Sequence, residues 1–270
     1  MSGLLPLTMR DLKKWYRNPI SLLTGLIQPF FWIALFGSAF DITRIGFPGF
    51  NPSTSLLGGA PNHITFIVGG VLTISGLFTA MFAGVNLIFD RRLGPMARFL
   101  VSPIRRSSIV FAKIISATFR IIVQVGILIF AALLLPNGLI FPAGFSIVNV
   151  AIIIVTVVLV SLIFTSIFSA IAIRITRMET IFGIINLVNL PLLFASYAMF
   201  PSGLMAGWLS NVAQYNPVSW SSEAIRMVII NGTLSASQMS QVISWIGALA
   251  LLAVSMTAIT FVIAERGIGD

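Results

Sequence analysis

A long apolar segment without charge constrains this chain more than any other feature. Residues 64–89 are 26 consecutive positions that carry no Asp, Glu, Lys or Arg. A helix needs roughly 20 apolar residues to cross the hydrocarbon core of a bilayer. The 270-residue chain is 57% hydrophobic and 9% charged, whereas a soluble domain carries roughly 25% charged residues. The sequence therefore predicts a protein whose solvent is lipid.

Five further apolar segments have the length of a membrane-spanning helix. The expected spans are about 20–40, 64–89, 111–135, 147–173, 181–200 and 242–264. Turn-forming residues such as those of Pro136–Gly138 separate them. The first span exceeds the roughly 7–15 apolar residues of a signal peptide, which favours a retained helix over a cleaved signal. We predict an all-α membrane protein with six transmembrane helices in one domain, residues 1–270.

The basic residues are divided unequally between the two sides of such a bundle. Cytoplasmic loops of membrane proteins carry an excess of Lys and Arg. With six spans, the N-terminal segment, the second and fourth loops and the C-terminus share a side that holds 14 of the 16 Lys and Arg. The other side keeps only Arg44 and Arg226. We therefore expect both termini in the cytoplasm. The net charge of +9 then reflects topology, and we expect no nucleic-acid partner.

The segment before the first span, LTMRDLKKWYRNP, is short and amphipathic. We expect an interfacial helix in which Leu12, Trp15 and Tyr16 face lipid while the neighbouring Lys and Arg side chains meet headgroups. The alternative is a basic flank without a helix of its own. A further cation, Arg120, lies inside the third span and can extend its guanidinium to the cytoplasmic headgroups.

Six of the 16 basic residues crowd into residues 89–114, FDRRLGPMARFLVSPIRRSSIVFAKI. Pro95 suits the first turn of a helix. Met96, Phe99 and Leu100 then share one face, while Arg98 points elsewhere. The pattern predicts a short amphipathic helix at the cytoplasmic side. Such a helix can lie on headgroups or dock into a groove of a soluble partner, and its periodicity does not choose between them.

About 40 residues separate Phe200 from the sixth span, and Pro and Gly interrupt them too often for a span. Asn216 can cap a helix that has Pro217 at its first position. Glu223 and Arg226 are three residues apart and can pair on one helix face. We expect this segment to enter the outer leaflet and return. A surface amphipathic helix is the alternative.

The second span carries two different faces. Gly76, Ala80 and Gly84 recur every four residues, as in closely packed helices. The opposite face carries Phe78, Phe82 and Asn86. An amide that faces lipid is costly, so this second face is a candidate lining for a cavity.

The fifth span offers a similar candidate face with Asn186, Asn189 and Leu193. For both spans there is a simpler alternative. The Phe side chains would contact lipid, Asn86 would reach the interface, and the two other amides would bond across the bundle.

Two stretches resemble the membrane subunits of ATP-driven exporters called ABC-2 type permeases, including the daunorubicin-resistance type. The first resemblance lies in residues 89–114, and its matching positions are Asp90–Arg92, Gly94, Met96–Val101, Ser102, Pro103, Arg105 and Lys113. The second lies in residues 190–232, and its matching positions are Leu190, Pro191, Phe194, Ser196, Phe200, Pro201, Asn216, Pro217, Glu223, Ala224 and Arg226. Six spans and a similar length extend the resemblance to the whole chain.

The resemblance implies a dimer of permease subunits, expected to be identical, bound to two ABC ATPase subunits. In the family, the short cytoplasmic helix is a coupling helix that seats in the ATPase. The corresponding docking residues here are Gly94, Met96, Arg98, Phe99, Leu100 and Arg105. The second and fifth spans line the export path in the family, which assigns substrate contact to the two candidate faces. The re-entrant segment with Asn216, Pro217, Glu223 and Arg226 caps that path. The implied location is a prokaryotic plasma membrane.

No Gly-Lys pair occurs in the chain, so it lacks the G-x-x-x-x-G-K-[ST] loop that binds nucleotide phosphates. We therefore expect no enzyme activity and no cofactor or metal on this chain, and ATP and Mg²⁺ on the partner ATPase. The Phe-rich face favours a hydrophobic, drug- or lipid-like cargo. A polysaccharide or lipid-linked glycan is the alternative cargo. An ATP-independent channel or scaffold is the alternative class, although spans so poor in charge argue against ion conduction.

Overall fold

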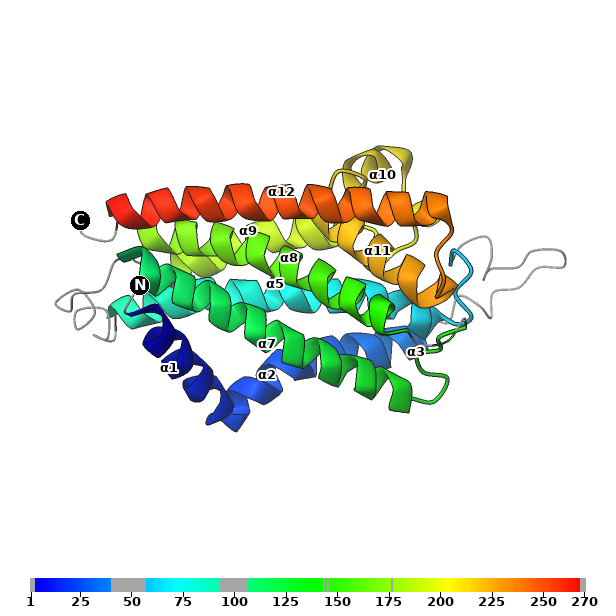
Figure 1. Ribbon diagram of the computed structural model, residues 1–270, viewed down its shortest axis with the longest axis horizontal. Coiled ribbons are helices and arrows are strands. Elements are labelled where there is room, and N and C mark those ends of the chain that lie inside the picture. The colour runs from blue at the N-terminus through cyan, green and yellow to red at the C-terminus, as the bar shows by residue number, and fades with distance from the viewer. Residues whose placement is uncertain are drawn as a thin grey trace, which may run out of the picture.

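The computed structural model describes residues 3–39, 57–92, 106–142, 144, 146–175 and 177–267. Regular structure within these residues is helical, with no strand. The long helices lie lengthwise in one bundle, and α1 begins at the end of the bundle where α12 stops (Figure 1). The helices are α1 Leu4–Tyr16, α2 Pro19–Phe31, η1 Trp32–Phe36, α3 Gly37–Ala39, α5 His63–Arg92, α7 Arg106–Leu134, α8 Ile147–Arg174, α9 Met178–Phe194, η3 Ser202–Leu204, α10 Gly207–Ala213, α11 Pro217–Asn231 and α12 Ala236–Gly267.

Among the described residues, four helices are long and apolar enough to cross a membrane. They are His63–Asp90 in α5, Ser107–Leu134 in α7, Ile147–Arg174 in α8 and Ala236–Arg266 in α12. These helices confirm the second, third, fourth and sixth apolar segments as helical. Three of them continue for several residues beyond the predicted bounds, because polar residues at their ends remain within the helix.

The first and fifth predicted spans correspond to shorter apolar helices, Gly25–Phe36 and Glu179–Phe194. Residues 19–39 are helical throughout. They form three segments, with Pro29 inside α2 and a π-helical turn in η1. Proline and π-turns both interrupt the regular α-helical ladder.

The predicted fifth span, 181–200, extends too far. Helix α9 ends at Phe194, and the side-chain amide of Asn216 donates to the carbonyls of Leu192 and Ala195 at 3.0 and 2.7 Å. The last carbonyls of α9 are therefore satisfied from another segment, and the chain leaves the helix there.

The predicted break at Pro136–Gly138 is confirmed. Asn137 adopts a φ of 51°, which is the left-handed region that ordinary residues rarely occupy. A Cβ on Gly138 would stand 2.2 Å from the carbonyl oxygen of Ala132, so the turn requires glycine. The amide of Asn62 holds this turn by donating to the carbonyls of Asn137 and Gly138, both at 2.8 Å.

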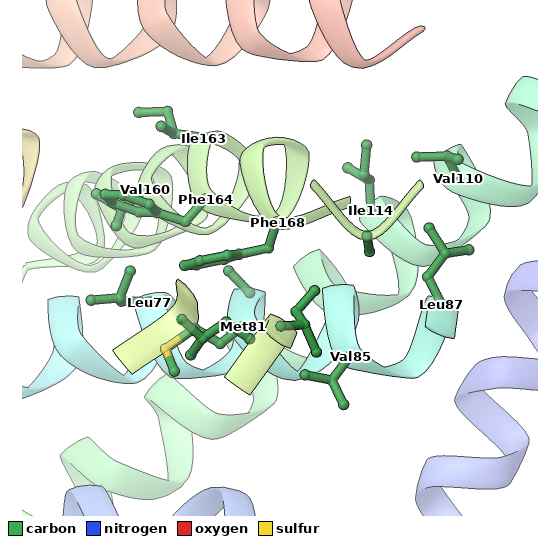
Figure 2. Packing of buried hydrophobic residues seen from close by; sticks show 14 of the residues in the cluster. Leu77, Met81, Val85, Leu87, Val110, Ile114, Val160, Ile163, Phe164 and Phe168 are labelled. Atoms are coloured by element: carbon green, nitrogen blue, oxygen red, sulfur yellow. The ribbon is translucent and has the colours of Figure 1, made fainter. Parts of the chain in front are cut away.

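Helix α5 is the centre of the bundle and packs most extensively on α8. A Cβ on Gly76 would meet Val157 at 3.1 Å, and one on Gly84 would meet the Phe168 backbone at 3.0 Å. Phe168 is fully buried and lies over α5 beside Leu77 and Met81 (Figure 2). The prediction of a close-packing glycine face on this helix is therefore confirmed.

Helix α1 is the predicted N-terminal amphipathic helix, but its faces differ from the prediction. Trp15 was expected to face lipid, yet it is buried with Leu7 and Asp11 on the side of α1 that packs on α7. Tyr16 is exposed. The indole packs inward because α7 offers Arg120 beside it, with the guanidinium carbon 5.8 Å from the ring centre. A cation above an aromatic face is attracted to the ring quadrupole.

Candidate functional site

The predicted cavity face of α5 borders a pocket. Phe78, Phe82 and Asn86 all line it, and its volume is about 170 Å³. We call it the elbow pocket, because residues of both α1 and α2 line it and these two helices meet at a bend (Figure 1). Its complete lining is Trp15, Gly25, Gln28, Pro29, Phe78, Thr79, Phe82, Asn86, Arg120 and Gln124. The structure thus brings the three sequence-predicted residues of α5 together around one space.

Polar groups from α5 and α7 meet in the elbow pocket. The Thr79 hydroxyl donates to the side-chain oxygen of Gln124 at 2.6 Å. The amide nitrogen of Gln124 points toward α2, where a Cβ on Gly25 would stand only 2.4 Å from it. Gln124 is 3% exposed. Glycine at position 25 therefore leaves the space that this buried amide occupies.

Arg120 reaches the elbow pocket from α7. One of its terminal nitrogens donates to the backbone carbonyl of Asp11 at 3.0 Å. Its Nε atom is buried and has no hydrogen-bond partner. The sequence placed Arg120 near the headgroups, and the structure adds that it joins α7 to α1.

The three candidate residues of α9 do not line the elbow pocket. Asn186 is exposed, whereas Asn189 and Leu193 are buried. Leu193 belongs to the core cluster built around α5 and α8. The side-chain oxygen of Asn189 is buried without a hydrogen-bond partner. Seven residues at about 100° each make nearly two full turns of a helix, so Asn186 and Leu193 lie on almost the same face of α9, at levels about two turns apart.

The predicted cap of the outer segment is confirmed. The side-chain oxygen of Asn216 accepts a hydrogen bond from the Val218 amide at 2.9 Å, and Pro217 occupies the first turn of α11. The nitrogen of the same side chain donates to the carbonyls at the end of α9. Asn216 therefore ends one helix and begins another, which fixes the direction in which the chain returns.

The predicted pair of Glu223 and Arg226 is also confirmed, at 2.7 Å. Arg226 is 3% exposed. It donates to the carbonyls of Phe66, Tyr197 and Ala198. Its guanidinium also lies 3.7 Å from the centre of the Phe66 ring. This side chain, which the sequence placed on the non-cytoplasmic side in the segment expected to enter the outer leaflet, is an internal connection between α5, α11 and the turn after α9.

A buried ion cluster lies where α1 meets α5 and α7. Asp11 pairs with Arg10 at 2.7 Å and with Lys113 at 2.9 Å. Asp90 pairs with Lys113 and, at 3.1 Å, with Arg10. The side chains of Asp11, Asp90 and Lys113 are each less than 10% exposed. The cluster ties α1 to the two helices that flank the predicted coupling loop.

Charge pairing in this cluster shifts two ionisation equilibria. Burial alone would raise the pKa of Asp11, but the pairs with Lys113 and Arg10 outweigh it and hold that pKa below its ordinary value. Burial alone would lower the pKa of Arg10, and its pairs with Asp11 and Asp90 raise it above the ordinary value instead. Both groups are therefore charged at neutral pH.

The sequence pattern alone does not reveal this cluster as a unit. A signal was present, because Asp11 is the one acidic residue before the first span and Asp90 is the one acidic residue in the basic stretch 89–114. An isolated acid among many bases commonly pairs with one of them when the surroundings exclude water. Which base it meets depends on how the helices pack.

The six predicted docking residues, from Gly94 to Arg105, lie outside the described residues. The structure describes the two helices on either side, with α5 ending at Arg92 and α7 beginning at Arg106. Within the described residues, no three His, Asp or Glu side chains gather in a way that could hold a metal ion.

Comparison with known proteins points to one family. The family model described as ABC-2 type transporter matches residues 4–230. A proposed transport permease named ycf38 from Porphyra purpurea is 29% identical over 231 residues, which cover 85% of this chain and 75% of that protein. The daunorubicin resistance ABC transporter permease protein of Streptomyces coeruleorubidus is 24% identical over 238 residues, with coverages of 86% and 76%. The family match includes the residues of the elbow pocket, the ion cluster and the outer segment up to residue 230.

Proposed function

Because this chain belongs to the ABC-2 type transporter family, we propose that it is the membrane-spanning permease subunit of an ATP-driven exporter. The observation that carries the proposal is the family match over residues 4–230, which includes the described helices from α1 through nearly all of α11. A transporter of this kind needs an ATPase, and the chain contains no nucleotide-binding loop. ATP and Mg²⁺ therefore bind to a partner ABC ATPase, present in two copies beside two copies of this chain.

The proposed membrane topology has six spans, with both termini in the cytoplasm of a prokaryotic cell. Helices α5, α7, α8 and α12 supply four spans. Residues 19–39 and α9 supply the other two. The short helices α10 and α11 then form the re-entrant segment in the outer leaflet. The basic residues of the N-terminal segment, the loop at 89–114 and the α8–α9 connection fall together on the cytoplasmic side.

Energy enters this permease through the loop between α5 and α7. We place the ATPase on the amphipathic segment 94–101, with Phe99 and Leu100 as the apolar anchors. The buried pairs among Asp11, Asp90 and Lys113 hold α1 to the two helices beside that loop. Movement of the loop would therefore be carried by α1, α5 and α7 together.

The cargo of this proposal is hydrophobic, drug-like or lipid-like. The supporting feature is the aromatic face of α5, where Phe82 is 49% exposed and borders the elbow pocket. In the dimer, the faces of α5 and α9 from both subunits would line the path outward. A glycan cargo finds less support, since Trp15 is the one Tyr or Trp among the residues that line the pocket.

Co-purification from the native membrane tests the proposal. We expect an ABC ATPase subunit to accompany the tagged wild-type chain, with measurable ATP hydrolysis. The double change Phe99→Asp and Leu100→Asp should remove both the subunit and the activity. The matched control is Arg174→Asp, which changes the net charge by the same −2. This variant should retain both the ATPase subunit and the ATP hydrolysis.

A wild-type chain that purifies without any ATPase would contradict the exporter assignment and favour the channel or scaffold. An ATPase that remains bound to the Phe99→Asp, Leu100→Asp variant would support the exporter but contradict the docking site. Permeability of reconstituted vesicles without ATP would be the positive sign of a channel.

A further inference from the structure

The elbow pocket has a composition that the proposed function does not explain. Among the residues that line it, Arg120 is the one with a charge, and none is acidic. A pocket for an uncharged hydrophobic compound would have no use for a cation, and placing one in an apolar bundle is costly. The presence of Arg120 in this pocket therefore requires a separate explanation.

The pairing of Arg120 within the chain is incomplete. Its contacts with α1 are the Asp11 carbonyl and the Trp15 ring, and its Nε atom has no partner. The carboxylate of Asp11 is already engaged by Arg10 and Lys113. Among the described residues, Arg120 forms no ion pair with a carboxylate, since Asp11 and Asp90 pair with Arg10 and Lys113 instead.

The polar part of the elbow pocket could hold an acidic group. Gln124 and Gln28 present amides from α7 and α2. Guanidinium and amide donors together match the acceptor oxygens of a carboxylate or a phosphate.

The apolar part of the pocket continues away from Arg120 along α5. Thr79 contacts Gln124 and Asp90 contacts Lys113, so α5 and α7 are antiparallel. Phe82, which is 49% exposed, therefore lies near the level of Arg120, and Phe78, one turn further from it, is partly buried. Arg120 contacts Trp15, four residues before α2 begins at Pro19. The cation therefore lies near the level where the first apolar helix starts, which in the proposed topology is the headgroup level of the cytoplasmic leaflet.

We propose that the elbow pocket receives an amphiphile whose acidic head group pairs with Arg120 and whose hydrocarbon chain lies along Phe78 and Phe82. The head group is a carboxylate or a phosphate, and the ligand enters from the cytoplasmic leaflet. This inference rests on the proposed function in one respect, because it identifies the class of cargo that the permease would admit. A cationic amphiphile would meet the unpaired charge of Arg120 and is excluded by the same argument.

Binding to the purified full-length chain tests the inference without ATP or ATPase. The chain is placed in nanodiscs of phosphatidylcholine and titrated with cis-parinaric acid or with its uncharged methyl ester. Binding is measured by energy transfer from tryptophan, since Trp15 lines the pocket, and affinities are expressed per mole of lipid so that partitioning does not contribute. We expect the wild type to bind the acid at least tenfold more tightly than the ester.

Variants then test which residues bind the acidic head group and which contact the hydrocarbon chain. Arg120→Gln should reduce the preference for the acid to near unity, and Arg120→Lys should restore part of it. Phe82→Ala should weaken both probes to a similar extent. The matched control Arg174→Gln removes a basic residue at the end of α8, outside the pocket, and should leave the preference unchanged.

Arg120→Gln also removes a contact with α1, so a second variant is needed. Gln124→Leu leaves the Asp11 and Trp15 contacts intact and should lower affinity for the acid severalfold while sparing the ester. Equal binding of acid and ester by the wild type would overturn the inference. So would a preference that persists in both Arg120→Gln and Gln124→Leu.

A further arm separates an amphiphile from a free anion. Inorganic phosphate should not displace parinaric acid from the wild type, because it lacks the chain that contacts Phe78 and Phe82. Displacement by phosphate would show that Arg120 binds a free anion, and it would contradict the proposal of an amphiphilic ligand. Failure of these binding tests leaves the ATPase co-purification unaffected, so the inference and the proposed function can fail separately.

Discussion

Arg226 and Arg120 are both arginines inside an apolar bundle, but their surroundings differ. Arg226 donates to three backbone carbonyls and to Glu223. Its donors are filled by groups from α5, α11 and the turn after α9, so it acts as a connector. Arg120 has one carbonyl partner and an unpaired Nε atom. We therefore assign stability to the first residue and ligand binding to the second.

Replacing Arg226 tests its role as a connector. Arg226→Met should destabilise the chain by about 3 kcal/mol or more, because the carbonyls of Phe66, Tyr197 and Ala198 would each lose a buried donor. Thermal unfolding in detergent measures the effect. Arg177→Met, at an exposed arginine, is the matched control and should leave the unfolding temperature within a few degrees. Similar unfolding temperatures for the two variants would contradict the assignment.

The ion cluster predicts a dependence of stability on pH. The folded pKa of Asp11 lies below its unfolded value of about 3.9. Its contribution is therefore complete above about pH 4 and is lost as the pH falls through the folded pKa. Asp11→Asn should lower the unfolding temperature at pH 6, and the difference from wild type should shrink toward pH 3. A difference that stays constant between pH 6 and pH 3 would show that the charge of Asp11 does not stabilise the fold.

At the scale of elements, α5 explains why this sequence needs so many small residues in its second span. It contacts α2, α7, α8, α9 and α11, and few side chains can fit between so many neighbours. Gly70 is the tightest position, since a Cβ there would overlap the carbonyl group of Ala198. By contrast, Gly126 in α7 has no heavy atom within 4 Å of such a Cβ.

These two glycines form a matched pair for a packing test. Gly70→Ala should destabilise the chain strongly or prevent folding, because the neighbour in its way is backbone and cannot move aside. Gly126→Ala should be neutral or raise stability by up to about 1 kcal/mol, since alanine favours helix. Yield and unfolding temperature of the two variants in the same detergent decide the matter. Equal behaviour would mean that α5 and the turn after α9 do not approach this closely.

At the scale of the whole molecule, the crossing of α9 decides the number of spans. Helix α9 has 17 residues, which is short of the roughly 20 needed to cross a bilayer. The chain has no cysteine, so single cysteines can report topology. Arg177→Cys and Asn211→Cys, which flank α9 at exposed positions, should react with a membrane-impermeant maleimide from opposite sides. Labelling of both cysteines from the same side would show that α9 does not cross the membrane.

The proposed export path makes a separate prediction for the assembled transporter. Phe82→Ala and Asn189→Ala should each change cargo-stimulated ATP hydrolysis by at least twofold, while the ATPase still co-purifies. Phe130→Ala is the control, because Phe130 is 64% exposed on α7 and does not line the elbow pocket. Wild-type stimulation in both path variants would contradict the assignment of these faces to the path.

The sequence by itself determined the features that depend on local pattern. Apolar length predicted the four long helices, the Pro136–Gly138 turn ended the third span, and the cap at Asn216 began α11. Each of these follows from residues close together in the chain, where period, capping and backbone restriction act directly. The glycine face of α5 was predictable for the same reason, because it repeats along one helix.

The tertiary structure alone decided which side chains meet across helices. Three sets of contacts depend on how the helices are rotated and packed against one another. They are the contact of Trp15 with Arg120, the ion pair of Asp11 with Lys113, and the hydrogen bonds of Arg226 to three distant carbonyls. In a chain this apolar, nearly every helix face is compatible with both lipid and core, so hydrophobic patterning cannot fix that rotation. The few charged groups determine the rotation of the helices, because each buried charge requires a partner once water is excluded.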